Sequence, residues 1–184
     1  LIINNWLNYP ADAMDYAGEA VRLSDSLGDE HLLAKSIRLK GGVHSYLGNY
    51  DSALVYTKKS LEIAESIRDT ILIDNALNNL GLTYYYLGSY PKALKNLLYA
   101  LRLKELSSEI YGRAQTINNV GLVYDKLKDY TRARVYFKEA LDFSTEHNEP
   151  NLQLYSLNNI GGTYLSENDA EKANEYFEQA QQLK

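Results

Sequence analysis

Leu77-Asn-Asn-Leu-Gly-Leu-Thr-Tyr84 is the stretch that decides the fold, because related segments recur at intervals of 40 residues. The others are Ile37-Arg-Leu-Lys-Gly-Gly-Val-His44, Ile117-Asn-Asn-Val-Gly-Leu-Val-Tyr124 and Leu157-Asn-Asn-Ile-Gly-Gly-Thr-Tyr164. Their shared glycines are Gly41, Gly81, Gly121 and Gly161. A fixed period in this range is typical of a repeat array, which offers an extended surface to another molecule.

Each repeat is predicted to contain two helices. Apolar residues and a glycine follow a three-to-four-residue spacing from Ile73 to Tyr84, which places them on one helical face. Gly88 suits the left-handed position after a helix, and Pro91 suits the first turn of the next one. The second helix then carries a buried stripe with a recurring small residue, which allows close helix packing: Ala13, Ala53, Ala93, Ala133 and Ala173.

The register predicts a single array over residues 1–184. It consists of a truncated first pair (1–28), three full pairs (29–68, 69–108 and 109–148) and a last pair (149–184). Residues 1–8 are expected to be the tail of a truncated helix. Because the sequence opens on Leu1 and stops within a helical pattern at Lys184, we expect a fragment or a processed chain of a longer protein.

The pattern Leu77…Leu80-Gly81…Tyr84…Gly88-Ser89-Tyr90…Ala93…Ala100 resembles the tetratricopeptide repeat (TPR). Two features depart from that family: the period is 40 rather than 34 residues, and the proline that usually ends the second helix is missing. The long variant is similar to arrays in bacterial sensor kinases, peptide-sensing bacterial regulators, polarity scaffolds and kinesin light chains. The resemblance implies an all-α, right-handed superhelical solenoid of antiparallel helix pairs.

The resemblance also implies that the first helices of successive pairs line a concave groove. The positions predicted to face it are Lys35, Arg38, Leu39, Gly42, Ser45 and Tyr46; Asn75, Asn78, Asn79, Leu82, Tyr85 and Tyr86; Gln115, Asn118, Asn119, Leu122, Asp125 and Lys126; and Tyr155, Asn158, Asn159, Gly162, Leu165 and Ser166.

Doubled asparagines are the sharpest functional signal at these positions. Asparagine is a mediocre helix former, and its amide offers both a donor and an acceptor that could pair with the main chain of an extended peptide. The predicted peptide-binding residues are therefore Asn78, Asn79, Asn118, Asn119, Asn158 and Asn159, with the second of each pair favoured. The alternative is that these amides bond to neighbouring helices or to carbonyls one turn back.

Charged and polar groove positions give a second set of candidates, namely Lys35, Arg38, Tyr85, Gln115 and Lys126. The family's second mode clamps a peptide carboxylate with several convergent basic residues. Because Lys35 and Arg38 stand almost alone here, solvated surface charge is the favoured interpretation of them.

Composition excludes several functions. The net charge of −5 argues against a nucleic-acid partner, and no apolar run approaches the ~20 residues that span a bilayer. The chain has no cysteine, and His31, His44 and His147 lie at unrelated registers. We therefore predict no enzyme activity, no cofactor and no metal site.

The predicted function is binding of a protein or an extended peptide, in the sensory or regulatory segment of a larger bacterial signalling protein. A free-standing cytoplasmic scaffold or peptide-responsive regulator is the alternative. Similarity to sensor-kinase arrays slightly favours a periplasmic over a cytoplasmic location. Self-association is a further alternative, with a homodimer through the C-terminal end, where Ala173, Tyr176, Phe177 and Ala180 occupy core registers.

Two further expectations follow from the register. Glycines such as Gly121 should lie at helix crossings, so that Gly121→Leu destabilises the array, while Asn119→Ala leaves stability nearly unchanged and weakens ligand binding. The periodic tyrosines, among the 17 in the chain, should be packing wedges with a buried ring and a hydroxyl at the edge.

Overall fold

The computed structural model describes residues 10–105 and 110–183, and every regular element in these ranges is an α-helix. The helices are α2 (Pro10–Ser26), α3 (Glu30–Tyr46), α4 (Tyr50–Ser66), α5 (Thr70–Tyr86), α6 (Tyr90–Lys104), α7 (Ile110–Lys126), α8 (Tyr130–Glu146), α9 (Pro150–Ser166) and α10 (Ala170–Gln182). The predicted all-α class and pairwise helix packing are confirmed. Residues 1–8, predicted as a helix tail, lie outside the described residues.

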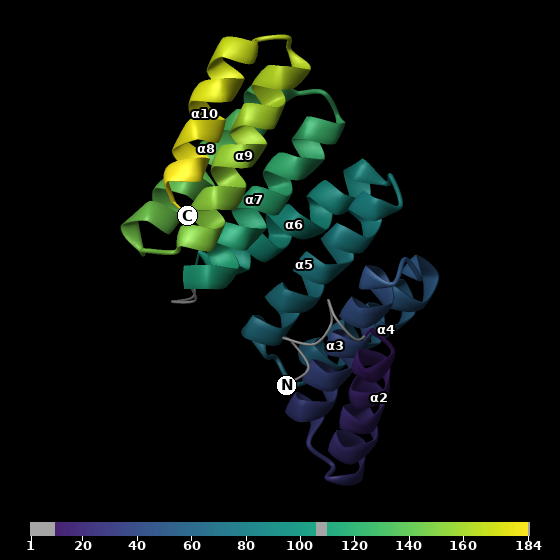
Figure 1. Cartoon of the computed structure of the whole chain (residues 1–184). Coiled ribbons are helices and arrows are strands. Elements are labelled where there is room, and N and C mark those ends of the chain that lie inside the picture. The colour runs from purple at the N-terminus through teal and green to yellow at the C-terminus, as the bar shows by residue number, and fades with distance from the viewer. Residues whose placement is uncertain (1–9, 106–109, 184) are drawn as a thin grey trace. The chain divides into compact units, whose positions relative to one another are not determined.

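The helices form two compact units, residues 1–103 and 104–184. Within each unit, consecutive helices are antiparallel and joined by short turns (Figure 1). In the first unit α3 packs against α2, α4 and α5; in the second α7 packs against α8 and α9, and α9 packs against α8 and α10. The recurring alanines form the centre of this packing and are at most 1% exposed. The single array over residues 1–184 stays a prediction, and each unit is described by itself.

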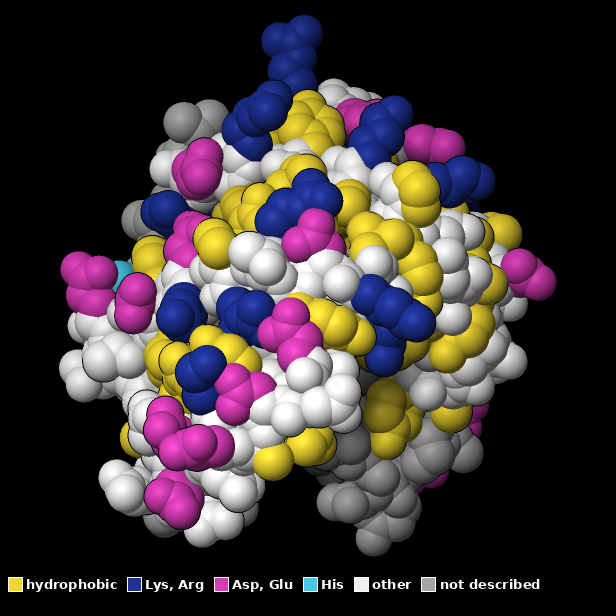
Figure 2. Space-filling view, turned by 90° about the horizontal axis from the view of Figure 1, so that it is seen from above, with side chains coloured by type: hydrophobic (Ala, Val, Ile, Leu, Met, Phe, Trp, Pro, Cys, Tyr) yellow, Lys and Arg dark blue, Asp and Glu magenta, His cyan; other side chains and the backbone are white. Residues whose placement is uncertain are grey.

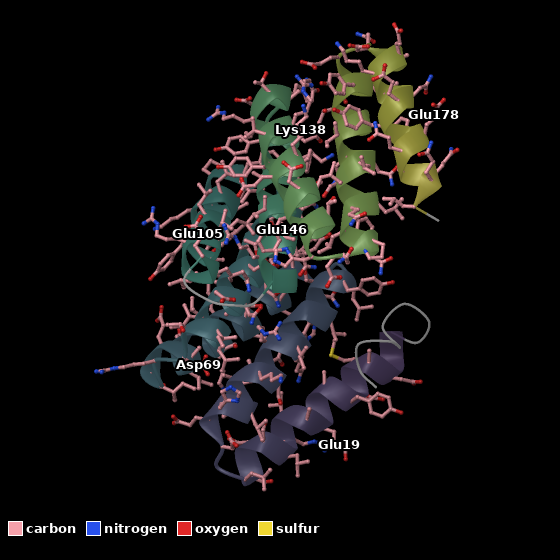
Figure 3. All side chains as sticks on the ribbon, turned by 90° about the vertical axis from the view of Figure 1, so that its left-hand side faces the viewer. Glu19, Asp69, Glu105, Lys138, Glu146 and Glu178 are labelled. Carbon is pink, nitrogen blue, oxygen red and sulfur yellow. The ribbon has the colours of Figure 1, made fainter. Side chains whose placement is uncertain are left out.

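The described turns between helices each contain one residue with positive φ. Three of these residues are glycines, including the predicted Gly88, and four are not: Arg68, Lys128, Asn148 and Asn168. Several turns end on an aspartate whose carboxylate accepts a backbone N–H of the following helix. Asp69, labelled in Figure 3 at the N-terminal end of α5, accepts from Leu72 at 3.0 Å. This side-chain cap stabilises the start of the helix.

Each of the four shared glycines lies where two helices cross, as predicted. A Cβ added at Gly41 would lie 2.5 Å from Thr57 Oγ1, and one at Gly81 would lie 2.5 Å from Leu97 Cγ. At Gly121 and Gly161 the same atom would lie 2.5 Å from ring carbons of Phe137 and Phe177, respectively. The close approach leaves no room for a side chain.

The periodic tyrosines form stacked, partly buried pairs that join the two helices of a repeat. Tyr124 stacks on Tyr136 with ring centroids 5.4 Å apart, and Tyr164 stacks on Tyr176 at 5.6 Å. His44 takes the place of the first tyrosine and stacks on Tyr56 at 5.1 Å. The wedge interpretation therefore holds for these pairs, whereas Tyr16 is 48% exposed and does not fit it.

Replacing His44 by tyrosine is expected to stabilise the fold, more at pH 5.5 than at pH 8. Burial, followed by the charge of Lys40, lowers the pKa of His44. The unfolded state therefore binds a proton more readily than the fold, so stability is lost as the pH falls below about 6.5. A tyrosine at this position would not titrate in that range and would keep an aromatic ring stacked on Tyr56, so the gain grows as the pH falls. Urea unfolding at both pH values measures the gain.

His31 and His147 are unchanged between wild type and His44→Tyr, so the difference in pH dependence isolates His44. Parallel pH profiles for the two proteins would contradict the role of His44.

Candidate functional site

A polar hollow of about 250 Å³ opens between α7 and α9 in the second unit. It is lined by Leu122, Asp125, Phe137, Asn158, Asn159, Gly162 and Ser166, and we call it the Asp125 pocket. Leu122 and Asp125 come from α7, Phe137 from α8 and the other four from α9. Residues spaced three or four apart on a helix share a face, which is why the register of the repeat brings this set together.

Hydrogen bonds hold the amide and hydroxyl groups of the pocket in place. Asn159 Nδ2 donates to Asn118 Oδ1 across the two helices at 3.0 Å, and Asn158 Nδ2 donates to the Leu154 carbonyl at 2.8 Å. Ser166 Oγ donates to the Gly162 carbonyl at 3.0 Å. Asn158, Asn159 and Ser166 each donate a hydrogen within the protein, and the side-chain oxygen of each of these three residues can still accept a hydrogen bond.

Asp125 supplies the charge of the pocket. Its side chain is half-buried, and burial raises the pKa of the carboxyl, an effect that the charge of neighbouring Lys126 opposes. Within the described residues the carboxylate accepts no hydrogen bond and forms no ion pair. It is therefore a partly desolvated anion whose charge no basic side chain of the described fold balances at contact distance.

A second hollow of about 300 Å³ lies on the other side of Asn158, between α9 and α10. Leu154, Phe177, Ala180 and Gln181 complete its lining. Asn158 thus stands between two adjoining depressions and is exposed to both.

A family model described as "Tetratricopeptide repeat" matches residues 32–106, 72–146 and 112–184, one repeat length apart each time. The chain belongs to the tetratricopeptide repeat family. TPR arrays are protein-interaction modules, and the recognition made from the Gly81 register is confirmed at that level. Comparison with curated proteins gives no match.

Solved structures of other proteins share the fold. A Rap protein complexed with competence and sporulation factor matches with a TM-score of 0.86 and 22% identity, over 93% of this chain and 48% of that one. A STAND protein with a tetratricopeptide repeat sensor from Pyrococcus horikoshii matches with a TM-score of 0.83 and 24% identity, over 99% of this chain and 28% of that one. Aspartyl phosphate phosphatase F from Bacillus subtilis matches with a TM-score of 0.72 and 16% identity, over 97% and 56%. This chain thus spans about half or less of the length of the Rap protein and of the STAND protein.

The predicted binding residues of this TPR array differ in how much surface they offer. In the first unit Asn78 is buried, Arg38, Asn79 and Tyr85 are half-buried, and Lys35 is exposed. In the second unit Asn119 is buried, Asn118 and Asn159 are half-buried, and Asn158, Gln115 and Lys126 are exposed. The structure therefore brings Asn118, Asn158 and Asn159 together beside the Asp125 pocket.

Two contacts correspond to the alternative interpretation of the asparagines. Asn158 bonds to a carbonyl one turn back, and Asn159 bonds to a neighbouring helix. Asn119 is only 6% exposed. We therefore revise the expectation that Asn119→Ala leaves stability unchanged, because removing a buried amide leaves its surroundings without a partner.

The binding-residue prediction did not include Asp125, Gly162, Ser166 or Phe137. The first three were counted only among groove-facing positions, and no role was predicted for Phe137. A single aspartate on a helix carries no signal in sequence, because its half-burial depends on which side chains of α8 and α9 surround it. The helix register was the only available clue.

Charge elsewhere on the surface is mixed. On the described part of the face in Figure 2, Lys and Arg side chains are interspersed with Asp and Glu. Lys138 on α8 and Glu178 on α10, labelled in Figure 3, are exposed. Among the described residues, no group of histidine and acidic side chains could hold a metal ion, and no helix is long and apolar enough to cross a bilayer.

Proposed function

We propose that this TPR module binds an extended peptide, or an extended segment of a partner protein, along the first helices of its repeats. The observation that carries the proposal is the polar surface of α7 and α9, where Asn118, Asn158 and Asn159 border the Asp125 pocket. Asparagines in helix interiors cost about 0.5 kcal/mol each relative to alanine, which a binding role explains.

An extended backbone presents alternating N–H and C=O groups, which side-chain amides can pair with regardless of the peptide sequence. The exposed Asn158 has an amide oxygen that accepts no bond within the described residues. The candidate contacts on the first unit are Lys35, Arg38, Asn78, Asn79 and Tyr85, and those on the second also include Gln115, Asn119 and Lys126.

The wider context that we propose is a sensory or regulatory segment of a larger bacterial signalling protein, located outside the cytoplasm. The fold supports the sensory or regulatory role, since similar structures include a Rap protein complexed with competence and sporulation factor and a STAND protein with a TPR sensor. The location is proposed from the resemblance to sensor-kinase arrays alone. A free-standing cytoplasmic scaffold or regulator is the alternative on the same evidence.

Peptide binding is tested by selecting binders to the 184-residue chain from a phage-displayed library of random linear peptides. The affinity of a selected peptide is then measured for wild type, for Asn158→Ala/Asn159→Ala and for Asn174→Ala, which removes an exposed asparagine of α10. We expect the double variant to bind at least about tenfold more weakly and the control to bind normally.

Circular dichroism checks that the three proteins have equal helicity before the comparison. Equal affinity for wild type and the double variant, or no selected peptide at all, would contradict the proposal.

Self-association is a second candidate function, favoured by a hollow of about 750 Å³ between α8, α9 and α10. Its lining includes the apolar side chains of Leu141, Leu157 and Leu183. Sedimentation at increasing protein concentration tests it: a mass that stays at the monomer value excludes this function.

A further inference from the structure

Gly162 is the feature of the Asp125 pocket that packing does not explain. A glycine in a helix interior is less favourable than any other residue except proline. At the preceding Gly161 there is a steric reason, because an added Cβ would lie 2.5 Å from Phe177 Cε1. At Gly162 an added Cβ would meet no atom within 4 Å. The loss of helix stability at Gly162 is therefore not explained by close helix packing, because the space beside this residue is open.

The repeat register shows what can fill this space. Leu82 and Leu122 occupy the position of Gly162 in the two preceding repeats, while Gly42 occupies it in α3. Because residue 162 lines the pocket, a leucine there would project into it. The pocket therefore exists at this repeat because α9 carries glycine at a position where α5 and α7 carry leucine.

Hydrogen-bond acceptors dominate the polar wall of the pocket. Ser166 donates its hydroxyl hydrogen to a backbone carbonyl, and Asn158 and Asn159 each use one amide hydrogen within the protein. The two amide oxygens, the Ser166 oxygen and the Asp125 carboxylate accept no bond within the described residues. A ligand group that satisfies four acceptors must be rich in donors.

Charge and apolar surface restrict further which chemical group the pocket can bind. The pocket contains one carboxylate and no basic side chain among the described residues, and α9 carries no Asp, Glu, Lys or Arg. Half-burial removes part of the hydration of the Asp125 carboxylate, and this raises the pKa of the carboxyl. Leu122 adds apolar surface of the kind that covers the methylene stem of a long basic side chain.

We propose that the Asp125 pocket is a subsite for one basic side chain, arginine above all, of the bound peptide or partner segment. A guanidinium has five donors in a planar fork and suits a carboxylate flanked by neutral acceptors. The proposal rests on the proposed peptide binding and adds to it a requirement on the sequence of the ligand. The net charge of −5 favours a basic partner.

The test uses the peptides selected on the wild-type chain. We expect them to share an arginine or lysine at one position. Replacing that residue by citrulline, which keeps the shape of arginine and removes its charge, should weaken binding to wild type at least about tenfold. With Asp125→Asn the same replacement should change affinity less than about twofold, because the charge that it pairs with is gone.

Two variants distinguish binding in the Asp125 pocket from a general effect of surface charge. Gly162→Leu should lose the preference for arginine while its melting temperature stays equal or rises, so that weaker binding cannot be attributed to unfolding. Glu178→Gln, which neutralises an exposed carboxylate on α10, should keep the full effect of citrulline.

Peptides that bind in an asparagine-dependent manner but show no basic preference would overturn this subsite and leave the proposed function intact. An effect of citrulline that is equal in wild type and Asp125→Asn would overturn it too. If no linear peptide is selected, the proposed function and the subsite are both wrong.

Discussion

Gly121→Leu is expected to lower the free energy of unfolding of the second unit by about 3 kcal/mol or more. The first side-chain atom alone would lie 2.5 Å and 2.6 Å from two ring carbons of Phe137. That ring is 1% exposed and packed between helices, so it has little room to move. Urea unfolding measures the loss of stability, and hydrogen exchange of the α7 and α8 amides shows whether the loss lies in the two helices that meet at Gly121.

Gly162→Leu is the matched control, since it makes the same chemical change on a first helix of the same unit. It is expected to leave stability unchanged or raise it by up to about 1 kcal/mol, because leucine is the better helix former, an added Cβ meets no atom within 4 Å and the rest of the side chain would enter the Asp125 pocket. A Gly121→Leu protein as stable as wild type would show that the crossing is not sterically limited. An equal loss of stability in both variants would mean that introducing leucine destabilises the helix at either position, whatever the packing around it.

The contrast between these glycines shows where sequence reasoning succeeds. The 40-residue register identified Gly41, Gly81, Gly121 and Gly161 as crossing points, because steric exclusion repeats wherever the packing repeats. The register gives residue 162 no fixed role, because the equivalent position holds glycine at Gly42 but leucine at Leu82 and Leu122. The neighbouring Gly161 also gives a sufficient reason for a small residue nearby. The sequence therefore could not show that Gly162 opens a pocket.

The asparagine pairs show a second limit. Identical Asn-Asn pairs in α5, α7 and α9 predict equal environments. At the first position, however, Asn78 is 8% exposed and Asn158 is exposed, and at the second position Asn119 is 6% exposed while Asn159 is half-buried. Periodicity fixes the direction in which a side chain leaves its helix. Its burial depends on side chains that differ between repeats, and those contacts decide which amides remain at the surface.

Turn residues illustrate the same point in the backbone. Gly88 was predictable as a left-handed residue, whereas the equivalent positive φ at Arg68 and Lys128 was not. These residues adopt a conformation that costs about 1 kcal/mol or more outside glycine, because the helices on either side fix the geometry of the turn. Tertiary packing overrides local preference at both positions.

Phe137→Ala has the largest expected effect on stability, a loss of about 3–5 kcal/mol. The phenylalanine is 1% exposed, fills the space beside Gly121 and forms part of the Asp125 pocket. Alanine would leave a cavity that continues into the pocket. Phe137→Leu should cost far less, because Leu97 fills the equivalent place opposite Gly81 in another repeat. Urea unfolding of both variants measures the difference.

Combining the two substitutions tests whether Gly121 and Phe137 act as one packing unit. Removal of the ring makes room for the leucine, so Gly121→Leu/Phe137→Ala should be more stable than the sum of the single changes predicts, by about 1–3 kcal/mol. Additive losses would mean that the ring moves aside in Gly121→Leu and that the strain lies elsewhere. The close approach of α7 and α8 at Gly121 gives the physical reason to expect coupling, since the two side chains compete for one volume.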